Sequence, residues 1–248
     1  MAHRGLGDGG YEALFAWNWR MTSVEAVRRF RFHVQRGDLA TGWQSLMELP
    51  DPHPPEVVLH LAECELALGD DARLRLALAR LTALRLRDAP DALLAFGEVL
   101  CGAVLSCLCE DALARSRYEA GFAFDPTWAA GEYGGAYVAC LIELDAFAEA
   151  HTALEPLRRS NDRAIVYRTM HARLLRRQED PQDALLALRF EEGPADDLGL
   201  VFEAACIFHA LGLRSRSVAL ARRARALNRA WFDKAVSQEP SHLRPVTD

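Results

Sequence analysis

Lysine is almost absent from this sequence. Of its 29 basic residues only Lys234 is a lysine, so arginine carries nearly all of the positive charge. A P-loop that binds nucleotide phosphates and a Schiff-base active site both require a lysine inside the folded domain. The scarcity of lysine therefore excludes both chemistries from the helical repeats described below.

Long apolar runs and strand-forming runs are also missing. No stretch reaches the roughly 20 apolar residues of a membrane span, and the N-terminal residues lack the apolar core of a signal peptide. β-Branched residues are sparse, whereas apolar residues recur with a helical period through most of the 248 residues. We expect an all-α protein located in the cytoplasm.

The charge balance argues against a general affinity for polyanions. The formal net charge is −6 at pH 7 and the isoelectric point is near 5.8. Hydrophobic residues make up 50% of the chain and charged residues 26%, which is enough apolar material to bury a core. The acidic total disfavours nucleic acid and anionic membrane as partners.

Signatures of catalysis and metal binding are absent as well. There is no HExxH motif and no CxxC pair, and single histidines stand on different predicted helices, at positions 33, 60, 151, 171 and 209. We therefore expect a protein that is not an enzyme and that needs no cofactor and no metal.

The six cysteines all fall inside predicted helices, at positions 64, 101, 107, 109, 140 and 206. We expect reduced thiols that pack between helices. The alternative is a metal or redox site in the CxxxxxCxC pattern of residues 101–109. A helix would point Cys107 and Cys109 about 200° apart, which disfavours that alternative.

The most informative stretch is residues 98–126, which has the pattern of two antiparallel helices. Its key residues are separated by 3, 9, 4, 3 and 5 positions and are Gly102, Leu105, Ala114, Tyr118, Gly121 and Pro126. Small residues let two helices cross closely, and the proline ends the second helix. Such a hairpin cannot bury its apolar face alone, so hairpins stack into a solenoid.

The pattern recurs with a period near 34 residues. The crossing position of each second helix is taken by Gly42, Leu74, Ala114, Ala150, Ala184 and Ser217, at separations of 32, 40, 36, 34 and 33. The predicted helix pairs are 23–36 with 39–49, 55–68 with 71–87, 91–108 with 111–123, 127–144 with 147–160, 162–177 with 181–190, and 197–211 with 214–230. We expect one repeat domain over 21–232, a flexible N-terminus with an aromatic capping helix within 1–20, and a flexible tail over 233–248.

This periodicity resembles the tetratricopeptide repeat (TPR) family, whose units carry small residues at positions 8, 20 and 27 and a proline at position 32. The third unit matches best, with Gly102, Ala114, Gly121 and Pro126 at these positions, although Cys101 replaces a large apolar residue. The resemblance covers residues 23–230. It implies a right-handed α-hairpin solenoid of about six TPR-like helix pairs. It also implies a noncatalytic scaffold or adaptor that binds a peptide or helix of a partner protein in its concave groove.

The resemblance further implies which residues line that groove. First-helix positions 2, 5, 9, 12 and 13 map to a wall that includes our candidate partner-binding residues, Arg31, Glu63, Gly135, Arg173, Arg176, Arg177 and His209. Glycine inside a helix lets something approach closely, and for Gly135 this could be a neighbouring helix as well as a ligand.

Arg173, Arg176 and Arg177 are the sharpest candidates among these residues. One helical turn brings them together, and guanidinium groups recognise carboxylate or phosphate through paired hydrogen bonds. They predict an acidic partner segment, whose binding would weaken on charge reversal with little loss of stability. The alternative is a solvated face whose arginines pair with Glu143 or Glu179.

A second basic cluster spans the second helix of the last predicted hairpin, residues 214–230, which contains no acidic residue. Its members are Arg214, Arg216, Arg222, Arg223, Arg225 and Arg229. Such a cluster could contact nucleic acid, but the acidic total of the chain disfavours this. The cluster keeps open a second function, a regulatory or sensor/oligomerisation module that acts with a bacterial transcription regulator. Self-association through the aromatic N-terminus is a further possibility.

Overall fold

A computed structural model describes residues 25–33, 38–49, 53–84 and 89–245. All regular structure in these ranges is helical, so the all-α prediction is confirmed. The predicted aromatic helix within 1–20 lies outside the described ranges. Within them, no helix combines the length and apolar character needed to cross a membrane.

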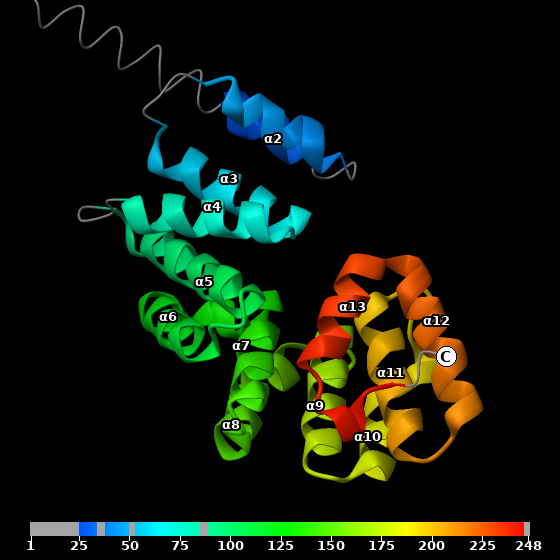
Figure 1. The fold of residues 1–248 in the computed structure, drawn as a ribbon. Helices are drawn as coiled ribbons and strands as arrows, with labels where there is room; N and C mark the ends of the chain where they lie inside the picture. The colour runs from blue at the N-terminus through cyan, green and yellow to red at the C-terminus, as the bar shows by residue number, and fades with distance from the viewer. Residues whose placement is uncertain (1–24, 34–37, 50–52, 85–88, 246–248) are drawn as a thin grey trace, which may run out of the picture. The chain divides into compact units, whose positions relative to one another are not determined.

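The helices follow one another in antiparallel pairs (Figure 1). After a helical stretch over 25–33, the α-helices are α2 (Leu39–Met47), α3 (Pro55–Leu68), α4 (Asp71–Ala83), α5 (Asp91–Cys107), α6 (Asp111–Phe124), α7 (Glu132–Glu143), α8 (Phe147–Asn161), α9 (Ile165–Arg177), α10 (Pro181–Leu188), α11 (Leu198–Ala210), α12 (Arg214–Leu227) and α13 (Arg229–Gln238). Three 3-10 turns are η1 (Pro126–Ala130), η2 (Phe190–Glu192) and η3 (Ser241–Leu243).

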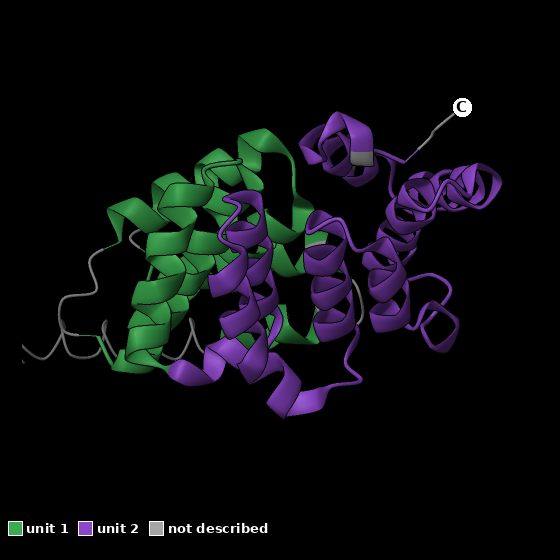
Figure 2. Cartoon of the chain, turned by 90° about the horizontal axis from the view of Figure 1, so that it is seen from below, with its two compact units in different colours: residues 1–125 green, residues 126–248 purple. Residues whose placement is uncertain are grey.

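The chain forms two compact units, which Figure 2 colours separately. Unit 1 is Met1–Asp125 and unit 2 is Pro126–Asp248, so the division falls at the proline that ends the third predicted repeat. In both units the most extensive helix contacts join the predicted pairs. First helices also contact one another, α3 with α5 in unit 1 and α9 with both α7 and α11 in unit 2.

The predicted crossing residues of the second helices are all buried, which confirms the repeat register. They are Gly42, Leu74, Ala114, Ala150, Ala184 and Ser217. In the third pair the close approach is direct, because a Cβ atom added to Gly102 would lie only 3.0 Å from the Tyr118 ring. In the last pair, the Ser217 hydroxyl donates a hydrogen bond of 2.9 Å to the Ala205 carbonyl of α11.

The backbone of the hairpin turns repeats with the same period. Five residues before the crossing residue of each of the last five pairs, the chain adopts a left-handed conformation, at Gly69, Cys109, Asp145, Glu179 and Gly212. In four of these turns the next residue donates its N–H to the carbonyl five residues earlier, as from Glu110 to Leu105 at 3.0 Å. This bond closes a Schellman-type helix end. Cys109 therefore lies in a turn, which corrects its predicted place inside a helix.

The predicted helix over 127–144 is interrupted. Residues Pro126–Ala130 form η1, Gly131 is extended, and α7 begins at Glu132. The turn folds back so closely that a Cβ atom on Gly134 would overlap the Ala129 carbonyl. Glycine at this position is what permits the break.

The C-terminal end differs most from prediction. The helix predicted over 214–230 ends at Leu227, and the Asn228 side chain accepts the Trp231 N–H at 3.0 Å to start α13. Trp231 and Phe232 both pack edge-on against the Phe202 ring of α11, at centroid distances of 5.4 and 5.8 Å. Residues 233–238 are helical as part of α13, where the polar composition had predicted a flexible tail.

Candidate partner-binding site

Helix α9 places the three sharpest candidates in the interior of unit 2. It packs against α7, α8, α10 and α11, so side chains on several of its faces meet other helices. We call Arg173, Arg176 and Arg177 the α9 arginine cluster. Their guanidinium groups meet carboxylates from α7, from α11 and from the segment after α13.

Arg176 is the centre of this network, with a side chain that is 0% exposed. Its Nε and Nη2 atoms donate to the two carboxylate oxygens of Glu203 at 2.6 and 3.1 Å. Its Nη1 and Nη2 atoms donate to those of Glu239, both at 3.0 Å. One guanidinium group therefore holds two buried carboxylates, each through two hydrogen bonds.

The ionisation of these groups follows from the pairing. Burial disfavours the charged form of Arg176, but Glu203 and the other neighbouring anionic groups outweigh it and raise the Arg176 pKa well above its usual value. Burial likewise disfavours the Glu239 carboxylate, yet its pairing with Arg176 and Arg173 lowers the Glu239 pKa. The Arg176–Glu239 pair is thus charged at neutral pH, and removing one partner would leave an unpaired buried charge.

Arg173 and Arg177 share Glu143 of α7. The Arg173 Nη2 donates to Glu143 Oε1 at 2.6 Å, and the Arg177 Nη1 lies 3.2 Å from Glu143 Oε2. Arg177 also reaches Asp145 Oδ1, at 3.2 Å. Their side chains are only 19% and 8% exposed.

This geometry corrects the predicted role of the cluster. Arg176 has no surface to offer a partner. The three guanidinium groups meet four carboxylates, so the predicted local positive potential is cancelled within unit 2. The sequence alternative of pairing with Glu143 describes Arg173 and Arg177, except that their side chains are largely buried rather than solvated.

Gly135 is also committed to the interior. It is buried on α7, and a Cβ atom there would overlap the Val166 side chain of α9. Of the two explanations that the sequence left open, close helix packing therefore accounts for Gly135. The residue has no surface for the partner contact that was predicted. His209 is half-buried near the end of α11 and remains a predicted contact.

The two candidates in unit 1 have different surroundings. Arg31 is exposed, and Glu63 of α3 is half-exposed and lies 3.0 Å from the Nδ1 atom of His60. The His60 ring lies between Phe30 and Phe96, at centroid distances of 5.1 and 6.0 Å. This row of rings joins the first helices of three consecutive pairs, and Glu63 contacts its central ring, His60.

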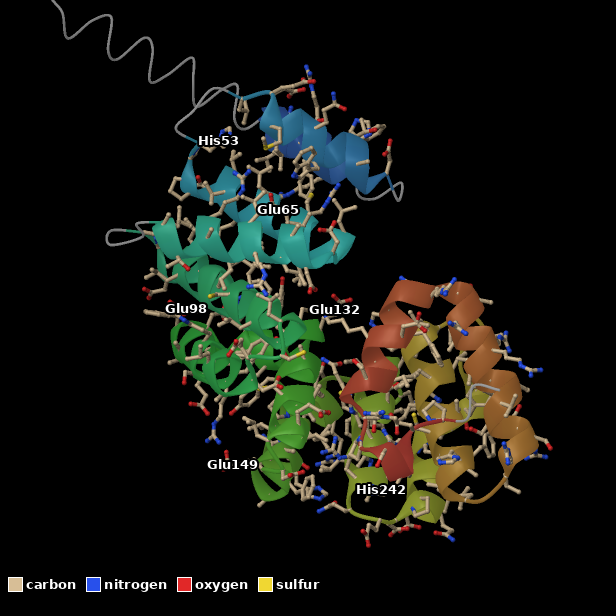
Figure 3. The ribbon with its side chains drawn as sticks, in the orientation of Figure 1. His53, Glu65, Glu98, Glu132, Glu149 and His242 are labelled. Carbon is tan, nitrogen blue, oxygen red and sulfur yellow. The ribbon has the colours of Figure 1, made fainter. Side chains whose placement is uncertain are left out.

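Sequence reasoning missed three buried carboxylates. Glu203 is the single charged residue in a helix with the sequence LGLVFEAACIFHA, and that isolation was an available signal of a buried ion pair. Glu239 carried no signal, because it lies in a polar segment. Glu65 of α3 is buried 3.2 Å from the Arg80 Nε of α4 (Figure 3), and its burial raises the Glu65 pKa despite that pairing.

The six cysteines differ in how far they are buried. Cys64, Cys101, Cys140 and Cys206 are buried, Cys107 is half-buried and Cys109 is exposed. Burial raises the pKa of the Cys64 thiol to about 12 and that of Cys206 well above its usual value. Both residues therefore hold thiols rather than thiolates at neutral pH, which favours the predicted packing role at these two positions.

Comparison with known proteins gives a match in fold. No protein-family model matches the chain. No curated protein sequence matches it either. Among solved structures, the chain is similar to a tetratricopeptide repeat protein from Parabacteroides merdae, with a TM-score of 0.51 and 15% sequence identity. The match covers 88% of this chain and 98% of that one. The chain therefore has a TPR-like helical-repeat fold, as the sequence pattern predicted.

Proposed function

We propose that this chain is a noncatalytic protein-interaction module that binds a segment of a partner protein along the first helices of its hairpins. The observation that carries the proposal is the row of Phe30, His60 and Phe96, which fixes three consecutive first helices side by side in unit 1. A fixed wall loses little entropy on binding, so side chains at its edge can hold an extended or helical segment.

In unit 2 much of the corresponding wall is covered by the chain itself. Phe202 and Cys206 of α11 form one buried cluster with Phe232 of α13. Glu239 pairs with Arg176 of α9, whose guanidinium group also holds Glu203 of α11. We therefore assign the partner segment to unit 1, beside Arg31 and Glu63.

Site-specific cross-linking tests this assignment. A photoreactive benzoylphenylalanine is placed singly at Arg31 and Glu63, and at the control positions Arg75 and Leu113. The controls lie on the second helices α4 and α6, where Arg75 is exposed and Leu113 is 58% exposed. The chain is irradiated in native cell extract, and cross-linked peptides are identified by mass spectrometry.

We expect one partner segment to cross-link from the two first-helix positions and not from the controls. A synthetic peptide of that segment should then bind the purified chain directly in a calorimetric titration. Cross-links of equal yield from both faces, or a peptide that does not bind, would contradict the proposal. A cross-link to a second copy of the chain would show self-association in place of partner binding.

A further inference from the structure

The hairpin formed by α12 and α13 carries a positive surface that the carboxylate of Asp233 offsets only in part. Helix α12 has the sequence RSRSVALARRARAL, with five arginines and no acidic residue. Its buried face is made by Ser217, Ala221 and Ala224, so the arginines stand on the solvent side. This arrangement is the reverse of α9, whose arginines are held inside.

Two of these side chains and that of Arg229, the first residue of α13, gather around one depression. Arg222, Arg225 and Arg229 line an open cavity of about 390 Å³, together with Ala221 and Ala226. Arg222 and Arg225 lie about one turn apart on α12, and Arg229 is the first residue of α13, beyond the extended Asn228 that separates the two helices. We call Arg222, Arg225 and Arg229 the hairpin arginines.

The geometry at Asp233 shows that two of these groups hold a carboxylate of the same chain. One oxygen of its carboxylate lies 3.3 Å from the Arg225 Nε and the other 3.6 Å from the Arg229 Nε. One carboxylate thus bridges two of the three guanidinium groups. Arg222 forms no ion pair with another residue in the described ranges, so the cavity keeps an excess of positive charge.

The surroundings favour a protein ligand over nucleic acid. Methyl groups of Ala221 and Ala226 form part of the lining, and the same hairpin exposes Leu227 and Trp231, at 42% and 39%. A peptide can match apolar and carboxylate groups to such a surface. A long polyanion would also meet the net charge of −6 carried by the whole chain.

We propose that the hairpin arginines form a docking site for an acidic segment of a partner protein. The inference rests on the proposed function, since it takes the partner to be a protein, and it adds a second contact on a different helix face. We keep the prediction of an acidic partner segment. We now assign its binding to the α12–α13 hairpin and not to the α9 arginine cluster.

A matched pair of variants tests the site. Arg222→Gln/Arg225→Gln removes two charges that line the cavity. Arg214→Gln/Arg223→Gln removes two exposed charges from the same helix that do not line it. The probes are a fluorescein-labelled peptide of alternating glutamate and leucine, its glutamine counterpart, and a single-stranded oligonucleotide of equal charge. Affinities are measured by fluorescence anisotropy over a series of salt concentrations.

We expect the wild-type chain to bind the glutamate peptide more tightly than the other two probes. Arg222→Gln/Arg225→Gln should weaken that binding about tenfold, and the control pair less than about twofold. Equal losses in both double variants would show unspecific charge attraction and overturn the site. Tighter binding of the oligonucleotide would overturn the assignment to a protein segment.

The docking site on the hairpin and the partner site in unit 1 can fail independently of each other. If cross-links from Arg31 and Glu63 persist while the hairpin variants bind the peptide normally, only the docking site on the hairpin fails. If the first-helix cross-links are absent while Arg222→Gln/Arg225→Gln still loses the glutamate peptide, the hairpin site stands and the unit 1 assignment fails.

Discussion

Arg176 and Glu239 form a two-pronged ion pair across 63 residues of sequence, with both donor–acceptor distances at 3.0 Å and both side chains fully buried. The pair fastens the segment after α13 to the last turn of α9. The Arg244 Nε donates to the Glu239 carbonyl at 2.8 Å, which further orders this segment. Residues near the C-terminus are therefore part of the core of unit 2.

Replacing Glu239 should weaken unit 2. In Glu239→Gln, Arg176 keeps Glu203 but loses one charged pair, so we expect the free energy of unfolding to fall by about 2–3 kcal/mol. Urea denaturation measures the change. Glu191→Gln, a substitution of an exposed glutamate in the same unit, should shift stability by less than about 0.5 kcal/mol. Identical midpoints for the two variants would contradict the account.

The contribution of Glu239 should also depend on pH. Because pairing with Arg176 lowers the Glu239 pKa against the opposing effect of burial, its stabilisation is complete above the unfolded pKa of about 4.3 and is lost as the pH falls through the lower folded value. The stability difference between wild type and Glu239→Gln should therefore shrink in acid below about pH 4. A difference that stays constant from neutral pH into this range would contradict the assignment of a charged pair.

Glu65 should behave in the opposite way. Burial raises the Glu65 pKa more than Arg80 lowers it, so its contribution to stability is largest below the unfolded pKa and is lost as the pH rises through the folded value. Glu65→Gln should thus be no less stable than wild type at pH 7, to within about 1 kcal/mol, because Arg80 keeps access to water. A loss as large as that of Glu239→Gln would refute this reading.

The crossing position of the third pair tolerates only a small residue. Ala114 is fully buried where α6 meets α5, so Ala114→Leu should overpack the contact and destabilise the fold by roughly 1–3 kcal/mol. Ala112→Leu adds the same bulk at an exposed position of α6 and should change stability by less than about 0.5 kcal/mol. Equal unfolding midpoints for the two variants would show that the repeat register is wrong.

Helix pairs were predictable from the sequence because their determinants are local. Small residues occupy five of the six crossing positions, which recur about every 34 residues. Gly69 ends one helix and Asp70 caps the next. The ion network was not predictable, since Glu203 and Glu239 lie 27 and 63 residues from Arg176. Spacing on α9 showed that its arginines converge, but it could not show what they converge on.

The α9 arginine cluster is internal, whereas the hairpin arginines are exposed. Urea denaturation of Arg173→Glu/Arg177→Glu beside Arg222→Glu/Arg225→Glu tests this difference directly. The α9 variant should lose at least about 3 kcal/mol, because it places new carboxylates against Glu143 and Glu239. The hairpin variant should stay within about 1 kcal/mol of wild type, since its arginines are exposed. Equal stability of the α9 variant and wild type would contradict the account and return those arginines to the surface role that the sequence first suggested.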